Sequence, residues 1–178
     1  TLAAYGQAGD QYRFYELNPA VVHVAKQYFS YLSDSKAQIS LVEGDGRVSL
    51  QQELELLNSD PSVETTLLIH AQVLQDFYAY NQFLSDADRL LLEMGLEGIY
   101  QIASFHPDYQ FGGTNPEDAE NYTNRSPYPL LHIIREASLE RAIAAYPDVD
   151  QVPIRNVALM NSMGHIKLQA LFEGLLKR

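Results

Sequence analysis

Several side chains in the middle of the chain have types and spacings that could do chemistry. His106 and Asp108 lie in the segment FHPDY, and His132 and Glu136 are four residues apart. Two imidazoles and two carboxylates could hold a metal ion through nitrogen and oxygen ligands. Alternatively, His106 could act as a general base that a carboxylate orients, while Arg125 binds an anionic substrate.

The same residues also have structural explanations. A His and a Glu at i, i+4 on a helix usually make a solvated contact, so we assign no metal ligands. Arg125 could brace a loop, and Asn121 and Asn124 could satisfy turn backbones. Polar residues are nevertheless dense in two proline-bounded loops here, which favours a small-molecule pocket. The candidate catalytic residues are therefore His106, Asp108, Arg125, His132 and Glu136.

Two further carboxylates stand at the ends of predicted strands. Glu16 closes the segment YRFYE, and Asp45 lies between two glycines after the segment ISLVE. A carboxylate at the carboxyl end of a strand can accept hydrogen bonds from both ribose hydroxyls, as in dinucleotide-binding folds. Both residues could equally be ordinary turn carboxylates, which is the commoner situation.

Hydrophobic periodicity predicts the elements that must position these residues. The predicted strands are Tyr12–Glu16, Ile39–Glu43, Thr65–His70 and Gly98–Phe105. Helices are predicted at about 19–31, 48–57, 73–94, 116–122 and 129–146, and two more within 153–178. Gly95 should cap the helix that ends at Met94.

Strands that alternate with helices indicate an α/β fold. We expect a single domain with about four mainly parallel or mixed strands and six or seven covering helices, or alternatively a two-layer α+β sandwich. Ile39–Glu43 should pair in one sheet with Thr65–His70, because the helix between them suits a crossover. The expected cleft at the rim of this sheet is formed by His106, Asn124, Arg125, His132 and Glu136.

The composition excludes several classes of partner. The chain has 178 residues, enough for one domain with a core, and its formal net charge is -11. No basic run is present, so we expect neither nucleic acid nor an acidic membrane surface as a partner. Without cysteine there is no disulfide or thiolate catalysis, and no apolar run reaches the length of a membrane span. We expect a cytoplasmic protein, with sequence missing upstream of Thr1.

The first fifty residues resemble the spermidine-synthase-like branch of S-adenosylmethionine-dependent transferases. The resemblance rests on TLAAYG, RFYELNP and VEGDGR. It implies that Glu16 holds the ribose of S-adenosylmethionine and that Asp45 contacts its adenine. The chain starts just after the position of the family's Gly-rich turn and lacks the strand with its catalytic Asp. We therefore expect no useful affinity for S-adenosylmethionine.

Residues from about Gln51 to Arg178 resemble the bacterial domain-of-unknown-function family 1415. The resemblance rests on ETTLLIHAQVLQDFYAYNQFL, QIASFHPDYQFGGT and DAENYTNRSPYPLLHIIREASLERAI. The family has no established activity to carry over, and the Cys-Pro-Phe stretch of its members is absent here. The two regions, residues 1–50 and 51–178, are expected to form one folded unit.

Three classes of function follow from these observations. The first is an enzyme of unknown reaction with a small-molecule pocket formed by FHPDY and NRSPYPLLHIIRE. The second is an incomplete S-adenosylmethionine-dependent transferase. The third is a non-catalytic binding module, which predicts a large exposed apolar patch and no polar pocket. The sequence leaves the oligomeric state open.

Overall fold

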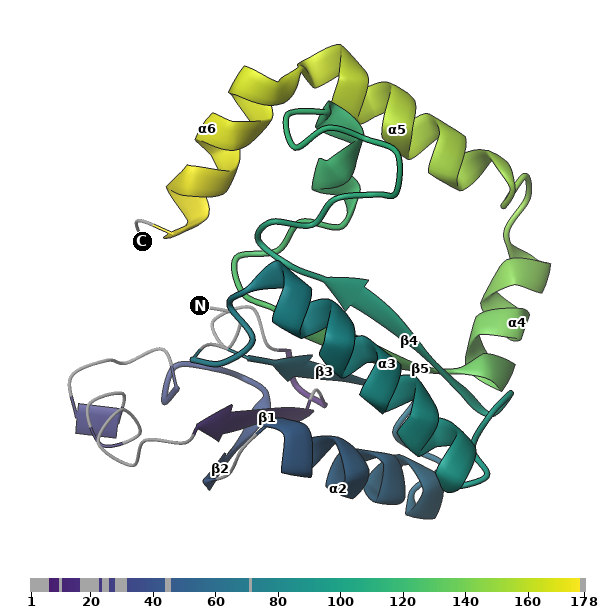
Figure 1. Cartoon of the computed structure of the whole chain (residues 1–178). Coiled ribbons are helices and arrows are strands. Elements are labelled where there is room, and N and C mark those ends of the chain that lie inside the picture. Colours follow the sequence, from purple (N-terminus) through teal and green to yellow (C-terminus); the bar gives the residue numbers. More distant parts are fainter. Residues whose placement is uncertain are drawn as a thin grey trace.

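The computed structural model describes residues 7–9, 11–16, 23, 26–27, 32–43, 46–70 and 72–176, whose arrangement is shown in Figure 1. These residues form five strands and six helices, of which η2 is a short 3-10 helix. In chain order the elements are β1 (Gln11–Glu16), β2 (Gln38–Glu43), α2 (Gly46–Ser59), β3 (Thr65–Ile69), α3 (Phe77–Glu93), β4 (Tyr100–Phe105), η2 (Ala119–Thr123), β5 (Leu130–Arg135), α4 (Glu136–Ala145), α5 (Gln151–Met163) and α6 (His165–Leu176).

The strands form two separate sheets, so the protein is a mixed α/β protein. β3, β5 and β4 make an antiparallel sheet with β5 in the middle, and β1 pairs with β2 in parallel. The expected single sheet of about four mainly parallel or mixed strands is wrong. The expected pairing of Ile39–Glu43 with Thr65–His70 is also wrong. The parallel pair is β1 with β2, whose connection is long enough for a crossover.

The segment LLHIIR was expected to be helical, but it is the strand β5. The helix predicted at 129–146 is therefore limited to α4, which begins at Glu136. Leu and Ile recur in this segment at spacings that suit either a helix or a strand, so periodicity does not separate the two. The partners decide, because β5 is hydrogen-bonded to a strand on each side and buries Leu131 and Ile133 completely.

The hydrophobic core lies between the three-stranded sheet and the helices α2 and α3 (Figure 1). α2 contributes Leu50, Leu54 and Leu57, whose spacing of three or four residues forms one apolar side. Leu131 and Ile133 of β5 belong to the same buried cluster. Helices on one face of an antiparallel sheet correspond more closely to the α+β alternative than to the expected α/β arrangement.

Helix α3 has clear sequence signals at both ends. Asp76 caps its start, where the side chain accepts a hydrogen bond from a backbone N–H of the first turn. Its end is a Schellman motif, in which the Gly95 N–H donates to the Leu92 carbonyl and the Leu96 N–H donates to the Leu91 carbonyl. Gly95 has φ 67, a conformation that favours glycine, so the prediction of a cap at Gly95 is confirmed.

The C-terminal helices, defined as α4 to α6, lie along an arc away from the sheet (Figure 1). α4 contacts β5, whereas α5 and α6 contact η2 and each other. The two helices expected within residues 153–178 are confirmed as α5 and α6. Among the residues described in these three helices, Leu168 is the one that is buried.

Some expectations lie outside the described residues. Of the helix predicted at about 19–31, the structure describes His23, Lys26 and Gln27, which are helical, and the remainder is outside. Asp45 also lies outside the described residues, and the structure describes the backbone of Glu16 without its side chain.

Candidate functional site

His106 follows directly after β4 and is fully buried. Its Nδ1 accepts a hydrogen bond from the Asp108 backbone N–H at 3.0 Å. The proton of the neutral ring must therefore lie on Nε2, which donates to the Leu74 carbonyl at 3.1 Å. Both ring nitrogens are thus occupied by backbone groups. The contact with Asp108 runs through its backbone and not through an orienting carboxylate.

The surroundings of His106 favour this neutral form. Its ring centroid lies 5.1 Å from that of Phe77 and 5.0 Å from that of Tyr80, both on α3. Burial among these rings lowers the pKa of His106, and the carbonyl of Leu74 and nearby carboxylates only partly oppose that effect. A general base needs an accessible lone pair, and the Nδ1 lone pair of His106 is already used. The geometry is that of a histidine that fixes the start of a loop.

The loop after β4, residues 106–129, is held together by its own polar side chains. Asn121 is fully buried, its amide donates to the Asn115 carbonyl, and its Oδ1 accepts two further hydrogen bonds from within the loop. Asn124 donates from its side chain to the Ser104 carbonyl of β4. Buried amide groups in a loop must find such partners, so these asparagines replace the missing backbone pairing.

Arg125 braces the same loop. Its Nε donates to the Tyr109 carbonyl at 3.3 Å, and one terminal nitrogen donates to the Pro116 carbonyl at 2.7 Å. Its guanidinium also lies 4.4 Å from the centroid of the Tyr122 ring. A planar guanidinium can join several acceptors and stack on an aromatic ring at the same time. These contacts occupy much of the group that was expected to hold an anionic substrate.

His132 lies on the other face of the antiparallel sheet. Side chains alternate along a strand, and its neighbours Leu131 and Ile133 are buried in the core beneath the helices. His106 packs on α3, which covers that core face. The two histidines therefore lie on opposite sides of the sheet, and the structure does not bring them into one cleft.

His132 is oriented by Thr65 of the neighbouring strand. The Thr65 hydroxyl donates to the Ile133 carbonyl at 2.7 Å, so it has no second proton to give. It must therefore accept the proton of His132 Nε2, at 2.6 Å. Burial lowers the pKa of His132, which favours this neutral ring. Within the described residues, no hydrogen bond to its Nδ1 is present.

Glu136 and Arg135 occupy the junction between β5 and α4. The Glu136 backbone N–H donates to the Ile99 carbonyl at 2.9 Å, which fixes the start of the helix. Arg135 donates to the carbonyls of Leu57 and Val63, near the end of α2 and before β3. Because β5 is a strand, His132 and Glu136 are not on one helical face. The five side chains expected to converge are therefore divided among the loop after β4, the open sheet face and this junction.

Sequence reasoning missed two residues that organise these positions. Tyr80 of α3 is fully buried, and its hydroxyl accepts from the Phe105 N–H at 3.0 Å and donates to the Leu130 carbonyl at 2.8 Å. Thr65 is the partner of His132 described above. Strand alternation would have placed Thr65 and His132 on one face if β5 had been recognised as a strand.

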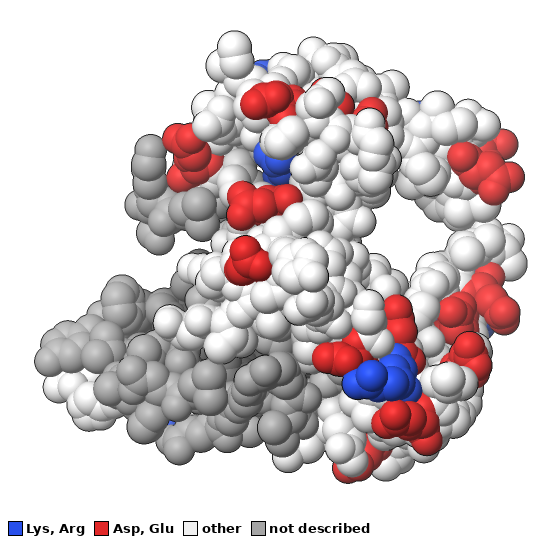
Figure 2. All heavy atoms as spheres, in the orientation of Figure 1, with Lys and Arg blue, Asp and Glu red and all other residues white. Residues whose placement is uncertain are grey.

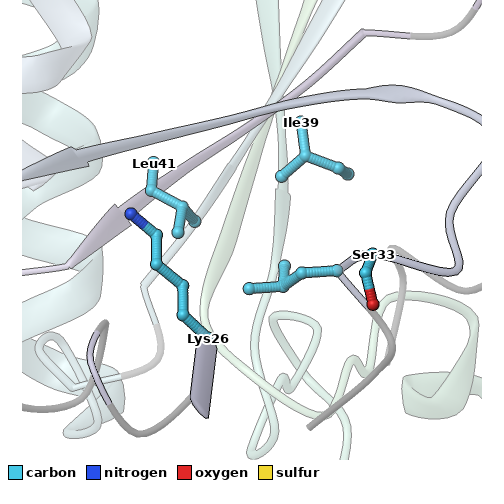
Figure 3. Close-up of a pocket in the computed structure, with 5 residues that line it drawn as sticks. Lys26, Ser33, Ile39 and Leu41 are labelled. Carbon is cyan, nitrogen blue, oxygen red and sulfur yellow. The ribbon is translucent and has the colours of Figure 1, made fainter.

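The parallel pair β1 and β2 sets the carboxyl ends of the two strands side by side, with Glu16 opposite Glu43. A pocket of about 340 Å³ near β2 is lined by Lys26, Leu32, Ser33, Ile39 and Leu41 (Figure 3). Its lining is mainly apolar and includes one amine. None of the residues expected to be catalytic lines this pocket.

Two kinds of feature are missing from the described residues. No group of three or more histidine, cysteine, aspartate or glutamate side chains within them is placed to hold a metal ion. None of the helices in the described part of the chain has both the length and the apolar character that crossing a membrane requires.

Comparison with known proteins identifies a family. No curated protein and no solved structure matches the chain. The family described as "Protein of unknown function (DUF1415)" matches residues 32–170. The match begins before the expected boundary near residue 50, so it includes β2 and the start of α2. Because the match covers most of the sequence, the chain belongs to the DUF1415 family.

Proposed function

We propose that this chain is a non-catalytic binding module whose contact surface is formed by the C-terminal helices. The observation that carries the proposal is a concentration of exposed large apolar side chains. In the part of the chain that the structure describes, seven of them lie on or between α4, α5 and α6: Ile143, Tyr146, Ile154, Leu159, Ile166, Leu171 and Leu175. Large exposed apolar surfaces mark sites of protein–protein contact, and these side chains follow one another along a single arc of helices.

The stability of these helices gives a second argument. α4 has 10 residues and α5 has 13, and neither contains a buried residue. Isolated helices shorter than about 12–15 residues are marginal in water, and tertiary packing normally stabilises them. Figure 2 shows an opening between this part of the molecule and the rest, and α5 and α6 pack on η2 and on each other and not on the sheet. A bound partner would supply the missing contacts.

The hydrogen bonds of the candidate site residues also favour a binding module over an enzyme. His106, Asn121, Asn124 and Arg125 use their hydrogen-bonding groups to hold backbone atoms of the chain. Binding a substrate at these groups would require breaking contacts that build the loop after β4. The enzyme with a pocket in FHPDY and NRSPYPLLHIIRE is therefore less well supported than the binding module.

Acid–base chemistry at His132 is a second candidate function, favoured by the Thr65 contact. A hydrogen bond that fixes Nε2 as the donor leaves Nδ1 as the basic atom, which is how oriented histidines act as bases. Diethyl pyrocarbonate, followed by mass spectrometry of each histidine, tests this candidate. We expect fast modification of His132 and protection of His106. Equal protection of both would remove His132 as a base.

Site-specific photo-crosslinking in cells of the native host tests the binding module. A photoreactive residue at Ile166, which is 85% exposed, should form a discrete adduct with a defined protein. The matched control is the same residue at Leu92 of α3, which is 60% exposed and lies outside the C-terminal helices. Adducts at Ile166 no more specific than those at Leu92 would contradict the proposal.

A further inference from the structure

We infer that the partner of the C-terminal helices is a second copy of this chain. This inference rests on the proposed function and makes it specific. It follows from three features: the distribution of charge along the chain, the amount of apolar surface, and an exposed apolar edge on α6.

The charge of the chain is strongly segregated. Residues 136–178 contain five acidic and five basic residues, so this part of the chain is neutral. The entire formal charge of -11 therefore lies in residues 1–135. Two identical chains repel each other through their acidic parts, but a contact between the neutral parts avoids that repulsion. A strongly basic partner would instead be drawn to residues 1–135, away from the exposed apolar side chains.

The amount of apolar surface fits a dimer. The seven side chains have exposed fractions between 43% for Ile143 and 85% for Ile166. At roughly 150–200 Å² for each fully exposed residue, they leave on the order of 700 Å² per chain. A standard stable interface buries about 800 Å² per partner. A dimer in which the whole arc of α4 to α6 meets its copy would therefore obtain most of its interface area from these side chains.

Helix α6 has an inner side that the chain itself covers. Tyr122, next to η2, packs edge-on against His165 at 5.7 Å and against Phe172 at 6.2 Å. Leu171 and Leu175 follow the buried Leu168 at spacings of three and seven residues, so they lie along the edge of this covered side, and they are 55% and 59% exposed. A two-fold axis can place this exposed apolar edge of α6 against its own copy, because such an interface uses the same surface twice.

Analytical ultracentrifugation of the full chain and of Leu171→Lys tests the inference. The wild-type chain should sediment as a dimer of twice 20.1 kDa at micromolar concentration. Leu171→Lys should raise the dimer dissociation constant at least tenfold, because a two-fold interface contains the substitution twice. The matched control Leu92→Lys changes an equally exposed leucine on α3 and should leave the dissociation constant within a factor of two.

The second variant, Leu175→Lys, lies on the same side of α6 and should weaken the dimer in the same way. Circular dichroism establishes that each variant is folded. A wild-type chain that stays monomeric to about 100 µM overturns the inference, as does a dimer that neither substitution on α6 weakens. If the chain is monomeric but Ile166 crosslinks to another protein, the binding module stands and the self-association is wrong. If Ile166 also gives no specific adduct, both proposals fail.

Discussion

The buried hydroxyl of Tyr80 allows the sharpest test of the fold. It lies where β4 and β5 separate, accepts a hydrogen bond from the Phe105 N–H and donates one to the Leu130 carbonyl. Tyr80→Phe removes this single oxygen and keeps the ring, which packs in the core. Two partly buried backbone groups then lose their partner at the same time.

The expected loss of stability follows from those two groups. Each buried polar group left without a partner costs about 1–3 kcal/mol, and these two are only partly buried, so Tyr80→Phe should lower the free energy of unfolding by about 2–4 kcal/mol. For a chain of this length, that corresponds to a fall in Tm of roughly 4–16 °C. Such a change is large beside the total stability of about 5–15 kcal/mol that is typical of a domain.

Urea unfolding followed by circular dichroism measures this loss, and the chain supplies a matched control two residues earlier. Tyr78 lies on the same helix, is 72% exposed, and its change to Phe should alter stability by less than about 0.5 kcal/mol. If Tyr80→Phe unfolds at the same urea concentration as Tyr78→Phe, the proposed role of the buried hydroxyl is wrong.

The alkaline pH dependence gives an independent readout of Tyr80. Burial raises the pKa of its hydroxyl, so the folded state keeps the proton more tightly than the unfolded state. The stability linked to this proton is complete below the unfolded pKa of about 10 and is lost as the pH rises above it. Tyr80→Phe should lose less stability than the wild type between about pH 10 and 11. Identical pH profiles would contradict this assignment.

Three further predictions concern the expected site residues. Burial lowers the pKa of His106, so the stability linked to its neutral form is present above about pH 6.5 and is lost as the pH falls. His106→Gln should lose less stability than the wild type between pH 6.5 and 5 in urea titrations, and an equal loss would contradict this. Arg125→Lys should speed protease cleavage within residues 106–129 several-fold, because lysine cannot reproduce the contacts to two carbonyls and a ring; unchanged cleavage would remove the bracing role. Calorimetry should detect no binding of S-adenosylmethionine, and micromolar binding that Glu16→Ala abolishes would prove that prediction wrong.

Most individual elements could be predicted from local sequence. Helix α3 combines a cap at Asp76, an apolar stripe and a terminal Gly95, all of which act within a few residues of each other. The strands at Thr65–Ile69 and Tyr100–Phe105 were also predicted to within two residues, because they are short, apolar and bounded by turns. The arrangement of strands into sheets could not be predicted in the same way, because it depends on pairing between distant segments.

The candidate site could also be predicted only in its local features and not in its long-range contacts. The sequence located a dense group of polar residues but not their partners. His106 and Arg125 bind backbone carbonyls, and every segment of a chain offers carbonyls, so composition and spacing do not reveal these contacts. The predicted position of His132 was wrong because LLHIIR was expected to be a helix, which would have placed His132 on one face with Glu136. LLHIIR is a strand, so the two residues are not on one helical face.

The sequence by itself determined the local helix signals, the absence of cysteine and the concentration of negative charge in residues 1–135. These are properties of composition or of neighbouring residues. Only the tertiary structure decided that Leu130–Arg135 is the central strand, that His106 and His132 lie on opposite faces, and that the C-terminal helices remain exposed. The physical reason is that a strand is stabilised by hydrogen bonds to other strands, and a helix face by the surface that covers it. In this chain both depend on segments far away in the sequence.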